Sequence, residues 1–135
     1  MFLGSFKTDF SGKNRLILPK RFRKELGNEE KFYILLGANG EIWGFDKVNW
    51  LKMTESILEF PLSTKEGRVK RLRFFPKAEE CGLDSQGRFV LPQEFMDNLN
   101  FKKEVFIIGA GDHFEVWEKK KWEEYLGQTN IDYGN

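Results

Sequence analysis

Near the N-terminus Phe6, Thr8 and Phe10 recur with a period of two. The polar turn Ser11-Gly12-Lys13-Asn14 separates this stretch from a second, mostly apolar one, residues 15–18. Two such stretches on either side of a polar turn predict a β-hairpin. Two further pairs of β-rich runs flank short turns and predict more hairpins: 31–37 with 41–45, and 104–109 with 113–117.

A helical spacing follows the first hairpin. Phe22 and Leu26 lie four residues apart between Pro19 and Gly27. Proline suits the first position of a helix and glycine ends one, so a short helix is predicted there. The same pattern recurs at residues 92–100, with asparagine in place of the glycine. Both residue types tolerate the left-handed conformation that ends a helix.

Three longer helices are predicted from their capping residues and apolar spacing. Asp46 and Glu118 stand before two of them, and the capping box Ser63-x-x-Glu66 opens a basic helix between them. The apolar positions of the three helices are Trp50, Met53 and Ile57; Val69 and Leu72; and Trp122, Tyr125 and Leu126. We expect the tryptophans to be core or subunit-interface anchors.

The chain contains an internal repeat. Residues 14–26 align with residues 87–99 at an offset of 73, and residues 34–50 align with residues 106–122 at an offset of 72. The predicted organisation is a first repeat (1–60), a basic connector helix (61–77), a second repeat (78–127) and a flexible tail (128–135). Each repeat has about four short strands, too few to close a barrel alone. The expected fold is therefore a β-rich α+β domain, a small barrel of two interleaved halves with peripheral helices.

The composition fits one folded domain of 135 residues, 40% of them hydrophobic and 32% charged. The N-terminus lacks the features of a signal peptide, and no apolar run is long enough to span a membrane. A single cysteine, Cys81, and a single histidine, His113, form neither a disulfide nor a Cys/His zinc site within one chain. We expect a protein of the reducing cytosol, with Cys81 as a buried small hydrophobe.

The net charge of +1 hides an uneven distribution. Residues 1–27 carry seven Lys or Arg against two acids, and residues 61–77 carry six against one. Each of the remaining segments, 28–60, 78–111 and 112–135, has six acids and three bases. Such a chain either directs one basic surface toward an anion or merely keeps its surface soluble.

These features together resemble the MraZ family, in which a polar turn ending in arginine, an apolar triplet, a proline and a short helix occur twice. The segments that carry the resemblance are MFLG (1–4), LDSQGRFVLP (83–92) and FIIGAGDHFEVWEKKKW (106–122), in the family's order. The resemblance implies a fold similar to the SpoVT-AbrB domain, a swapped-hairpin, double-psi β-barrel whose two half-motifs lie in one polypeptide.

The resemblance also implies a function. Members of this family are bacterial, nucleoid-associated transcriptional regulators, and a ring-like homo-oligomer, typically an octamer, is expected. The expected partner is double-stranded DNA with short repeated G-rich boxes upstream of the division and cell-wall gene cluster, bound as a repressor. No cofactor, metal, membrane or small-molecule substrate is expected.

The family's Asp-x-x-x-Arg motif is intact in the second repeat as Asp84 to Arg88. In the first repeat serine replaces the acid, at Ser11, and Asn14 stands before Arg15. Asparagine tolerates a positive φ, so the turn can keep its geometry.

The expected DNA-binding residues lie in and after the first turn. The planar fork of Arg15 can donate two hydrogen bonds to a guanine, whereas Lys13 suits a phosphate. We interpret Asp84 and Arg88 as a structural ion pair, since Arg88 has an acid four residues before it and few basic neighbours. The full set of expected DNA contacts is Lys13, Asn14, Arg15, Lys20, Arg21 and Arg23.

Some of these basic residues have a plain alternative. The cations at 20–24 contact phosphates or form a solvated helix face. Those of the connector contact DNA or, as we favour, pair with the acidic segments of a neighbouring subunit; they are Arg68, Lys70, Arg71 and Arg73.

Parts of the sequence also allow two functions other than DNA binding. Asp112, His113 and Glu115 could form an acid–base group, but the first repeat has no equivalent and no nucleophile elbow or phosphate loop is present, so an enzyme is not expected. The second alternative is a protein-binding module of the AbrB fold, antitoxin-like or a scaffold, without specific DNA recognition.

Overall fold

The computed structural model describes residues 1–129, apart from the side chains of residues 98, 99 and 129. Its strands are β1 (Ser5–Asp9), β2 (Arg15–Ile17), β3 (Lys31–Leu36), β4 (Ile42–Phe45), β5 (Glu79–Gly82), β6 (Arg88–Val90), β7 (Glu104–Gly109) and β8 (Phe114–Glu118). Its helices are α1 (Lys20–Arg23), continued by a 3₁₀ turn (Lys24–Leu26), α2 (Lys47–Leu58), α3 (Lys65–Phe74), followed by a 3₁₀ turn (Phe75–Lys77), α4 (Gln93–Leu99) and α5 (Lys119–Thr129).

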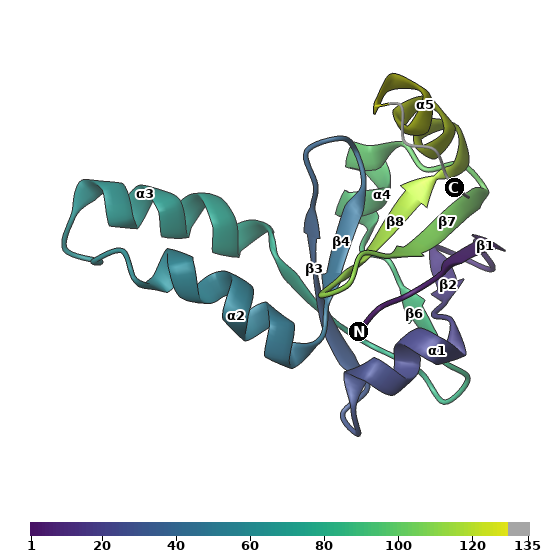
Figure 1. Ribbon diagram of the computed structural model, residues 1–135, viewed down its shortest axis with the longest axis horizontal. Coiled ribbons are helices and arrows are strands. Elements are labelled where there is room, and N and C mark those ends of the chain that lie inside the picture. Colours follow the sequence, from purple (N-terminus) through teal and green to yellow (C-terminus); the bar gives the residue numbers. More distant parts are fainter. Residues whose placement is uncertain (130–135) are drawn as a thin grey trace.

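Strands from the two repeats are interleaved. Six strands form an antiparallel sheet in the order β1-β7-β8-β4-β3-β5, and β2 pairs with β6 in a separate two-stranded ribbon (Figure 1). The first strand of each repeat thus pairs with a strand of the other repeat: β1 pairs with β7, and β5 pairs with β3. The expected mixed α+β class is confirmed. The hydrogen-bonded barrel is not: among the described residues, β2 and β6 pair with each other and with no other strand, so the sheet does not close into a barrel.

The six-stranded sheet and the ribbon share one phenylalanine-rich core. The inward residues of the ribbon, Leu16 and Phe89, are almost completely buried in the same cluster as Phe32 and Phe114. The ring of Phe114 lies 5.4 Å from that of Phe32 and 5.8 Å from that of Phe22 on α1. The Phe32 ring also lies 5.0 Å from that of Phe89 in the ribbon, so these ring contacts join the helix, the sheet and the ribbon into one unit.

The helix ends match the predicted residues with small shifts. Pro19 and Pro92, predicted at the first helical position, are instead the N-cap residues of α1 and α4, one position before the first helical residue. Gly27 and Asn100 follow these helices with φ of 74° and 50°, so both predicted stops are confirmed.

The capping box predicted for α3 is wrong by one residue. The cap is Thr64, whose hydroxyl accepts a hydrogen bond from the Gly67 amide at 3.0 Å. Serine and threonine both cap helices, and only the backbone path decides which of two neighbours has the extended conformation of an N-cap. Glu118 accepts from the Lys121 amide at 3.0 Å, so the carboxylate before α5 does cap its first turn.

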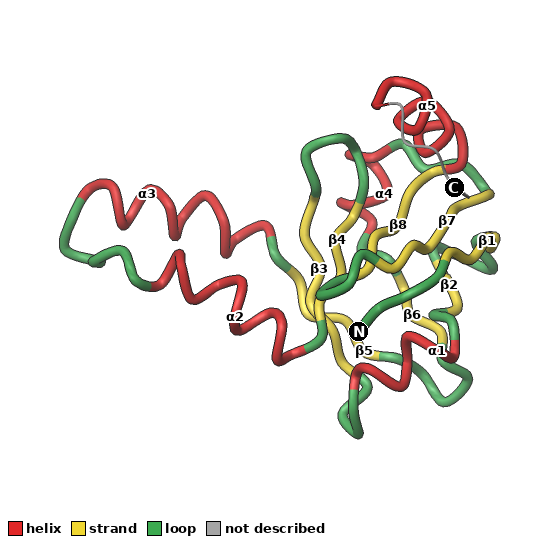
Figure 2. Tube along the Cα trace, viewed as in Figure 1, coloured by secondary structure: helices red, strands yellow, loops and turns green. Residues whose placement is uncertain are grey.

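Helices α2 and α3 form an antiparallel hairpin that projects from the sheet (Figures 1 and 2). Trp50 fixes its base by stacking on Tyr33 at 5.2 Å and on Phe74 at 5.7 Å. Arg71 closes the hairpin, because its Nη2 donates to the carbonyls of Leu58 and Phe60, both at 3.0 Å. The predicted connector helix is therefore one arm of this hairpin.

The predicted tail, residues 128–135, is described only at its first two residues, which end α5; residues 130–135 lie outside the described residues. No helix in residues 1–129 has the length and apolar character needed to cross a membrane.

Candidate nucleic-acid interface

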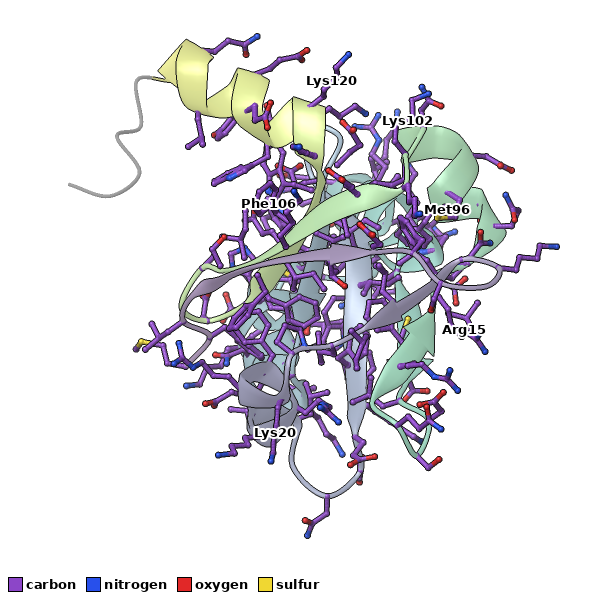
Figure 3. All side chains as sticks on the ribbon, turned by 90° about the vertical axis from the view of Figure 1, so that its right-hand side faces the viewer. Arg15, Lys20, Met96, Lys102, Phe106 and Lys120 are labelled. Atoms are coloured by element: carbon purple, nitrogen blue, oxygen red, sulfur yellow. The ribbon has the colours of Figure 1, made fainter. Side chains whose placement is uncertain are left out.

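The ribbon β2–β6 presents two arginines on one exposed face. Arg15 lies opposite Val90, and Arg88 lies opposite Ile17. Directly opposed residues of an antiparallel pair point to the same side, and residues two apart along a strand do so as well. Because Leu16 and Phe89 point into the core, the outer face carries Arg15, Ile17, Arg88 and Val90. Arg15 projects from this outer side in Figure 3.

The two turns that lead into the ribbon share part of their backbone geometry. Ser11 N donates to the Arg15 carbonyl at 2.8 Å, and Asp84 N donates to the Arg88 carbonyl at 2.8 Å. Asn14 has a φ of 60° where Gly87 has 79°. The carbonyl of Asn14 accepts from Leu91 N, and that of Gly87 accepts from Leu18 N (2.8 and 2.9 Å). Asparagine therefore adopts the positive φ expected at this position, although the turns differ at their second residue, where Gly12 has a φ of 54°.

In the second turn the arginine is held by the acid. Arg88 Nε donates to Asp84 Oδ2 at 2.8 Å, and Asp84 Oδ1 accepts from the amides of Arg88 and Gln86 at 2.8 and 2.9 Å. The backbone hydrogen bond from Arg88, followed by the bonds from its side chain and from the Gln86 amide, lowers the pKa of Asp84. This carboxylate therefore organises its turn as well as its arginine.

In the first turn the arginine has no such partner. Arg15 Nε is buried and donates to no acceptor among the described residues. Its guanidinium lies over Gly12, where a Cβ would stand 2.7 Å from Arg15 Nη2. Serine at position 11 thus offers this arginine no carboxylate, and a buried donor is left unused, which is costly in the free protein.

The other expected DNA contacts divide between two places. Lys13 is exposed on the first turn, and Asn14 Nδ2 donates to Gln93 Oε1 on α4 at 2.9 Å. The basic residues of α1 do not gather around Arg15, and Figure 3 shows Lys20 well apart from it. Arg21 Nη1 donates to the Leu3 carbonyl at 3.5 Å, and Arg23 packs against the second turn, where a Cβ on Gly87 would collide with it.

Two residues of the outer face, Ile17 and Val90, are not among those expected from the sequence. Ile17 is 45% exposed and Val90 is 58% exposed, and a hollow of about 480 Å³ beside Val90 is lined by both Arg15 and Arg88. A signal for them exists: the two residues are equivalent in the repeat, and each lies between two neighbours that the core requires. An apolar side chain between two buried ones on a strand must point outward.

His113 forms a closed cluster with two carboxylates. Its Nδ1 lies 2.7 Å from Asp112 Oδ1, its Nε2 lies 2.7 Å from Glu115 Oε2, and its ring stacks on Phe45 at 5.1 Å. Burial lowers its pKa most, but the hydrogen bonds and charges of Glu115 and Asp112 outweigh burial and raise the pKa overall. Both ring nitrogens are engaged, so neither is free for a substrate proton. The ring is also mostly buried.

Cys81 is buried in the core as expected. Burial, with smaller contributions from Glu79 and Glu80, raises the pKa of its thiol to about 12, so it is not a nucleophile at neutral pH. Within residues 1–129, no group of three or more His, Cys, Asp or Glu side chains could hold a metal ion.

The chain matches known proteins over almost its whole length. The family model described as "MraZ protein, putative antitoxin-like" matches residues 1–72 and 74–132. A protein of Clostridium tetani named "Transcriptional regulator MraZ" is 36% identical, over 98% of this chain and 92% of its own length. Proteins with the same name from Caldicellulosiruptor saccharolyticus and Clostridium acetobutylicum are 34% and 33% identical, over 97% and 98% of this chain and 90% and 91% of their own lengths.

These matches confirm the family inferred from the duplicated turn, and they agree with a protein that is not an enzyme. The chain belongs to the MraZ family.

Proposed function

We propose that this protein is a DNA-binding transcriptional regulator and that the outer face of the ribbon β2–β6 enters the major groove. The observation that carries the proposal is the outer face of the ribbon, on which two arginines lie diagonally opposite and each is paired across the ribbon with an exposed apolar side chain. The major groove admits a two-stranded ribbon, in which arginine recognises guanine and apolar side chains contact thymine methyl groups.

Arg15 is the base-reading residue of this proposal. Among the described residues no carboxylate forms an ion pair with its guanidinium, so binding DNA requires no such pair to be broken. Two parallel hydrogen bonds to O6 and N7 of a guanine would use the planar fork of the side chain. Arg88 is held by Asp84 and shapes the second turn.

The remaining cations position the protein on the phosphate backbone. Lys13 lies two residues before Arg15 on the same exposed turn, and Asn14 links this turn to α4. Lys20, Arg21 and Arg23 extend the positive surface along α1 and toward the second turn. Phosphate contacts of this kind add affinity that falls with salt and carry no sequence information.

The target we propose is a set of short repeated G-rich boxes upstream of the division and cell-wall gene cluster, bound by a cytoplasmic, nucleoid-associated repressor. The support is the family of the chain and the guanine-reading chemistry of arginine. Several identical ribbons on one assembly would make binding to tandem boxes tight through a high effective concentration.

The assembly we propose is a ring-like homo-oligomer, an octamer by the family expectation, joined through the α2–α3 hairpin. Exposed apolar side chains gather on this hairpin: Val48, Leu51, Leu58, Leu62, Val69 and Leu72. Lys70 pairs with Glu66 and Arg71 bonds to the end of α2, so these two cations serve the hairpin itself. Sedimentation of Leu51→Gln/Leu72→Gln should give smaller particles than the wild type, and particles of equal size would refute the hairpin as the interface.

The fold we propose for each subunit is the swapped-hairpin arrangement of the AbrB type. The exchange of β1 and β5 between the two halves supports it.

The test of the function is a fluorescence-anisotropy titration of the wild type and Arg15→Ala against tandem G-rich and scrambled duplexes at several salt concentrations. We expect the wild type to prefer the G-rich duplex and Arg15→Ala to lose that preference with its oligomeric state unchanged, at a cost of about 1–3 kcal/mol. Equal binding of both duplexes by the wild type would refute sequence-specific recognition of these boxes and favour a protein-binding module.

A further inference from the structure

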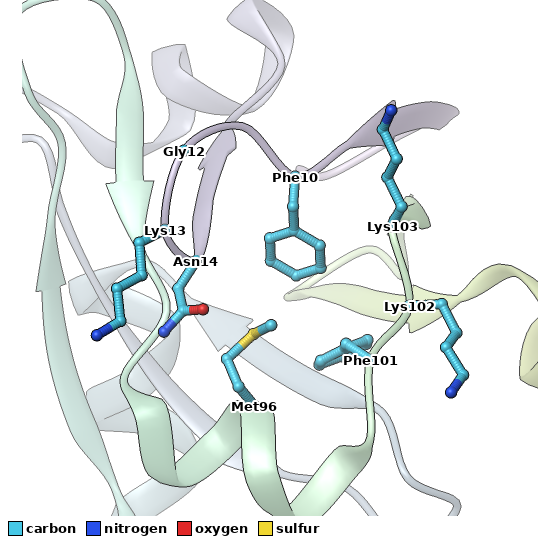
Figure 4. A pocket seen from close by; sticks show the side chains of 8 residues that line it. All are labelled: Phe10, Gly12, Lys13, Asn14, Met96, Phe101, Lys102 and Lys103. Carbon is cyan, nitrogen blue, oxygen red and sulfur yellow. The ribbon is translucent and has the colours of Figure 1, made fainter.

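An open groove lies beside the first turn, between the two repeats. It encloses about 580 Å³ and has an apolar centre of Phe10, Met96 and Phe101 (Figure 4). Three lysines surround this centre: Lys13 from the first turn, and Lys102 and Lys103 from the segment that leads into β7. The groove therefore combines residues that are about 90 positions apart in the chain.

The two walls of the groove are held at a fixed separation. Phe10 N donates to the Lys103 carbonyl at 3.0 Å, and Asn14 Nδ2 donates to Gln93 Oε1 at 2.9 Å. The rings of Phe10 and Phe101 are 5.8 Å apart across the floor. Binding in this groove would not have to order a loose segment first.

The positive charge of the groove is not neutralised within the chain. The structure gives the ammonium groups of Lys13, Lys102 and Lys103 no ion pair with any described residue, and no acid lines the groove. Glu104, the next residue along the chain, is occupied by Lys7 at 3.6 Å and by Lys119 at 3.2 Å. Three free cations around one hollow favour an anionic ligand.

The directions of the lysines select the shape of that ligand. In Figure 4 the three ammonium groups point away from the centre and away from one another, whereas the apolar side chains converge. A compact phosphate compound would need the cations to converge on it. A nucleic-acid strand instead carries separated phosphates along its length, with apolar sugar faces between them.

We propose that this groove holds the sugar–phosphate backbone of the DNA strand that flanks the bases read by the first turn. Lys102 and Lys103 contact phosphates, and Phe10, Met96 and Phe101 contact deoxyribose. The proposal rests on the proposed function, because Lys13 and Asn14 belong both to the groove and to the reading turn. It makes the second repeat part of the DNA site, although that repeat is acidic overall.

The test compares Lys102→Gln/Lys103→Gln with the matched control Lys47→Gln/Lys52→Gln. The control removes the same charge from two exposed positions of α2, on the projecting hairpin (Figure 1). Anisotropy titrations use the tandem G-rich duplex and the scrambled duplex over a salt series, after circular dichroism and sedimentation have shown an unchanged fold and assembly.

We expect the groove variant to lose about tenfold in affinity for both duplexes alike. The slope of log K against log salt should become less negative by about two, because two phosphate contacts are lost. The control should stay within about twofold of the wild type. This loss leaves the ratio between duplexes unchanged, whereas Arg15→Ala changes that ratio.

The other possible outcomes would each refute a different part of these proposals. An unchanged slope, or a loss confined to the G-rich duplex, would overturn the backbone role of Lys102 and Lys103 and leave the function of Arg15 intact. If ATP alone bound tightly to the wild type and weakly to the groove variant, the groove would be a nucleotide site. If the wild type bound neither duplex, the proposed function and the groove proposal would both be refuted.

Discussion

Arg15 and Arg88 lie diagonally across from each other on one face of the β2–β6 ribbon, yet only Arg88 has a carboxylate partner. The two turns share the hydrogen bond to the arginine carbonyl and the positive φ of the residue before the arginine. They differ at their second residue, where Gly12 but not Ser85 has a positive φ, and in the side chain at positions 11 and 84, where only Asp84 supplies a carboxylate. Repeats that differ in this way can divide two tasks, one turn holding its shape and the other binding a partner.

The single change Ser11→Asp should give the first turn the ion pair of the second. We expect the free energy of unfolding to rise by about 0.5 kcal/mol, the range of a partly exposed pair. Affinity for the G-rich duplex should fall about two- to fivefold, because the pair must be broken before Arg15 can reach a base. Thermal unfolding and anisotropy measure the two effects.

The reverse change, Asp84→Ser, is the control for this exchange. It removes the acceptor of Arg88 and the two amide contacts, so stability should fall while the affinity is kept or increased. A Ser11→Asp variant that binds DNA as tightly as the wild type would contradict the importance of an unpaired Arg15.

Gly87 is the glycine of the ribbon turns that alanine should replace least well. Its φ is 79° and a Cβ there would collide with Arg23, so Gly87→Ala should destabilise the protein by about 1–2 kcal/mol. Gly82→Ala is the matched control in the preceding strand, where a Cβ would meet nothing within 4 Å, and should change stability by less than about 0.5 kcal/mol. Urea unfolding of both variants tests this, and equal losses would contradict the steric argument.

The local elements of this fold could be predicted from the sequence, because their causes are local. The first turn, the helix stops at Gly27 and Asn100 and the buried position of Trp50 follow from nearby residues. The partners of the strands could not be predicted, since pairing β1 with β7 depends on packing between residues about 100 positions apart. The closed barrel was inferred from the number of strands, and that number does not determine which strand edges form hydrogen bonds with each other.

The candidate site divides in the same way. The repeat identifies Arg15 and Arg88 as equivalent, and the structure adds that they share a face. The net charge of each segment does not indicate Lys102 and Lys103, because residues 78–111 are acidic overall. Only the folded structure brings these two lysines beside Lys13. The one-residue error at Thr64 has a smaller cause, the φ and ψ of two adjacent hydroxyl residues.

Phe114 lies at the centre of the core, where its ring contacts Phe2 near the N-terminus, Phe22 on α1 and Phe32 on β3. Phe114→Ala should therefore cost about 3–5 kcal/mol, which is large for one domain. Val48→Ala on α2, where the side chain is 60% exposed, should cost less than about 0.5 kcal/mol in the monomer. Chemical denaturation of both variants is the measurement, and a loss below about 1 kcal/mol for Phe114→Ala would contradict its place at the centre of the core.

His113 should make stability depend on pH near neutrality. Its pKa is raised in the folded protein, because the carboxylates of Glu115 and Asp112 outweigh the effect of burial. A group with a raised folded pKa binds more protons in the folded state, so its contribution is complete below the unfolded pKa of about 6.5 and is lost as the pH rises through the folded pKa. The aromatic neighbours Trp43 and Phe45 do not titrate, so the two carboxylates set the direction.

The variant His113→Gln removes this titration and leaves a polar side chain between the carboxylates. We expect it to lower the free energy of unfolding by about 1 kcal/mol at pH 6, where the charge-assisted bonds exist, and by clearly less at pH 9. Phe45→Leu, which weakens the stacking without changing a charge, should cost the same at both pH values. Thermal unfolding across this pH range decides between the two behaviours. A His113→Gln cost that stayed constant from pH 6 to pH 9 would mean that His113 acts through packing alone.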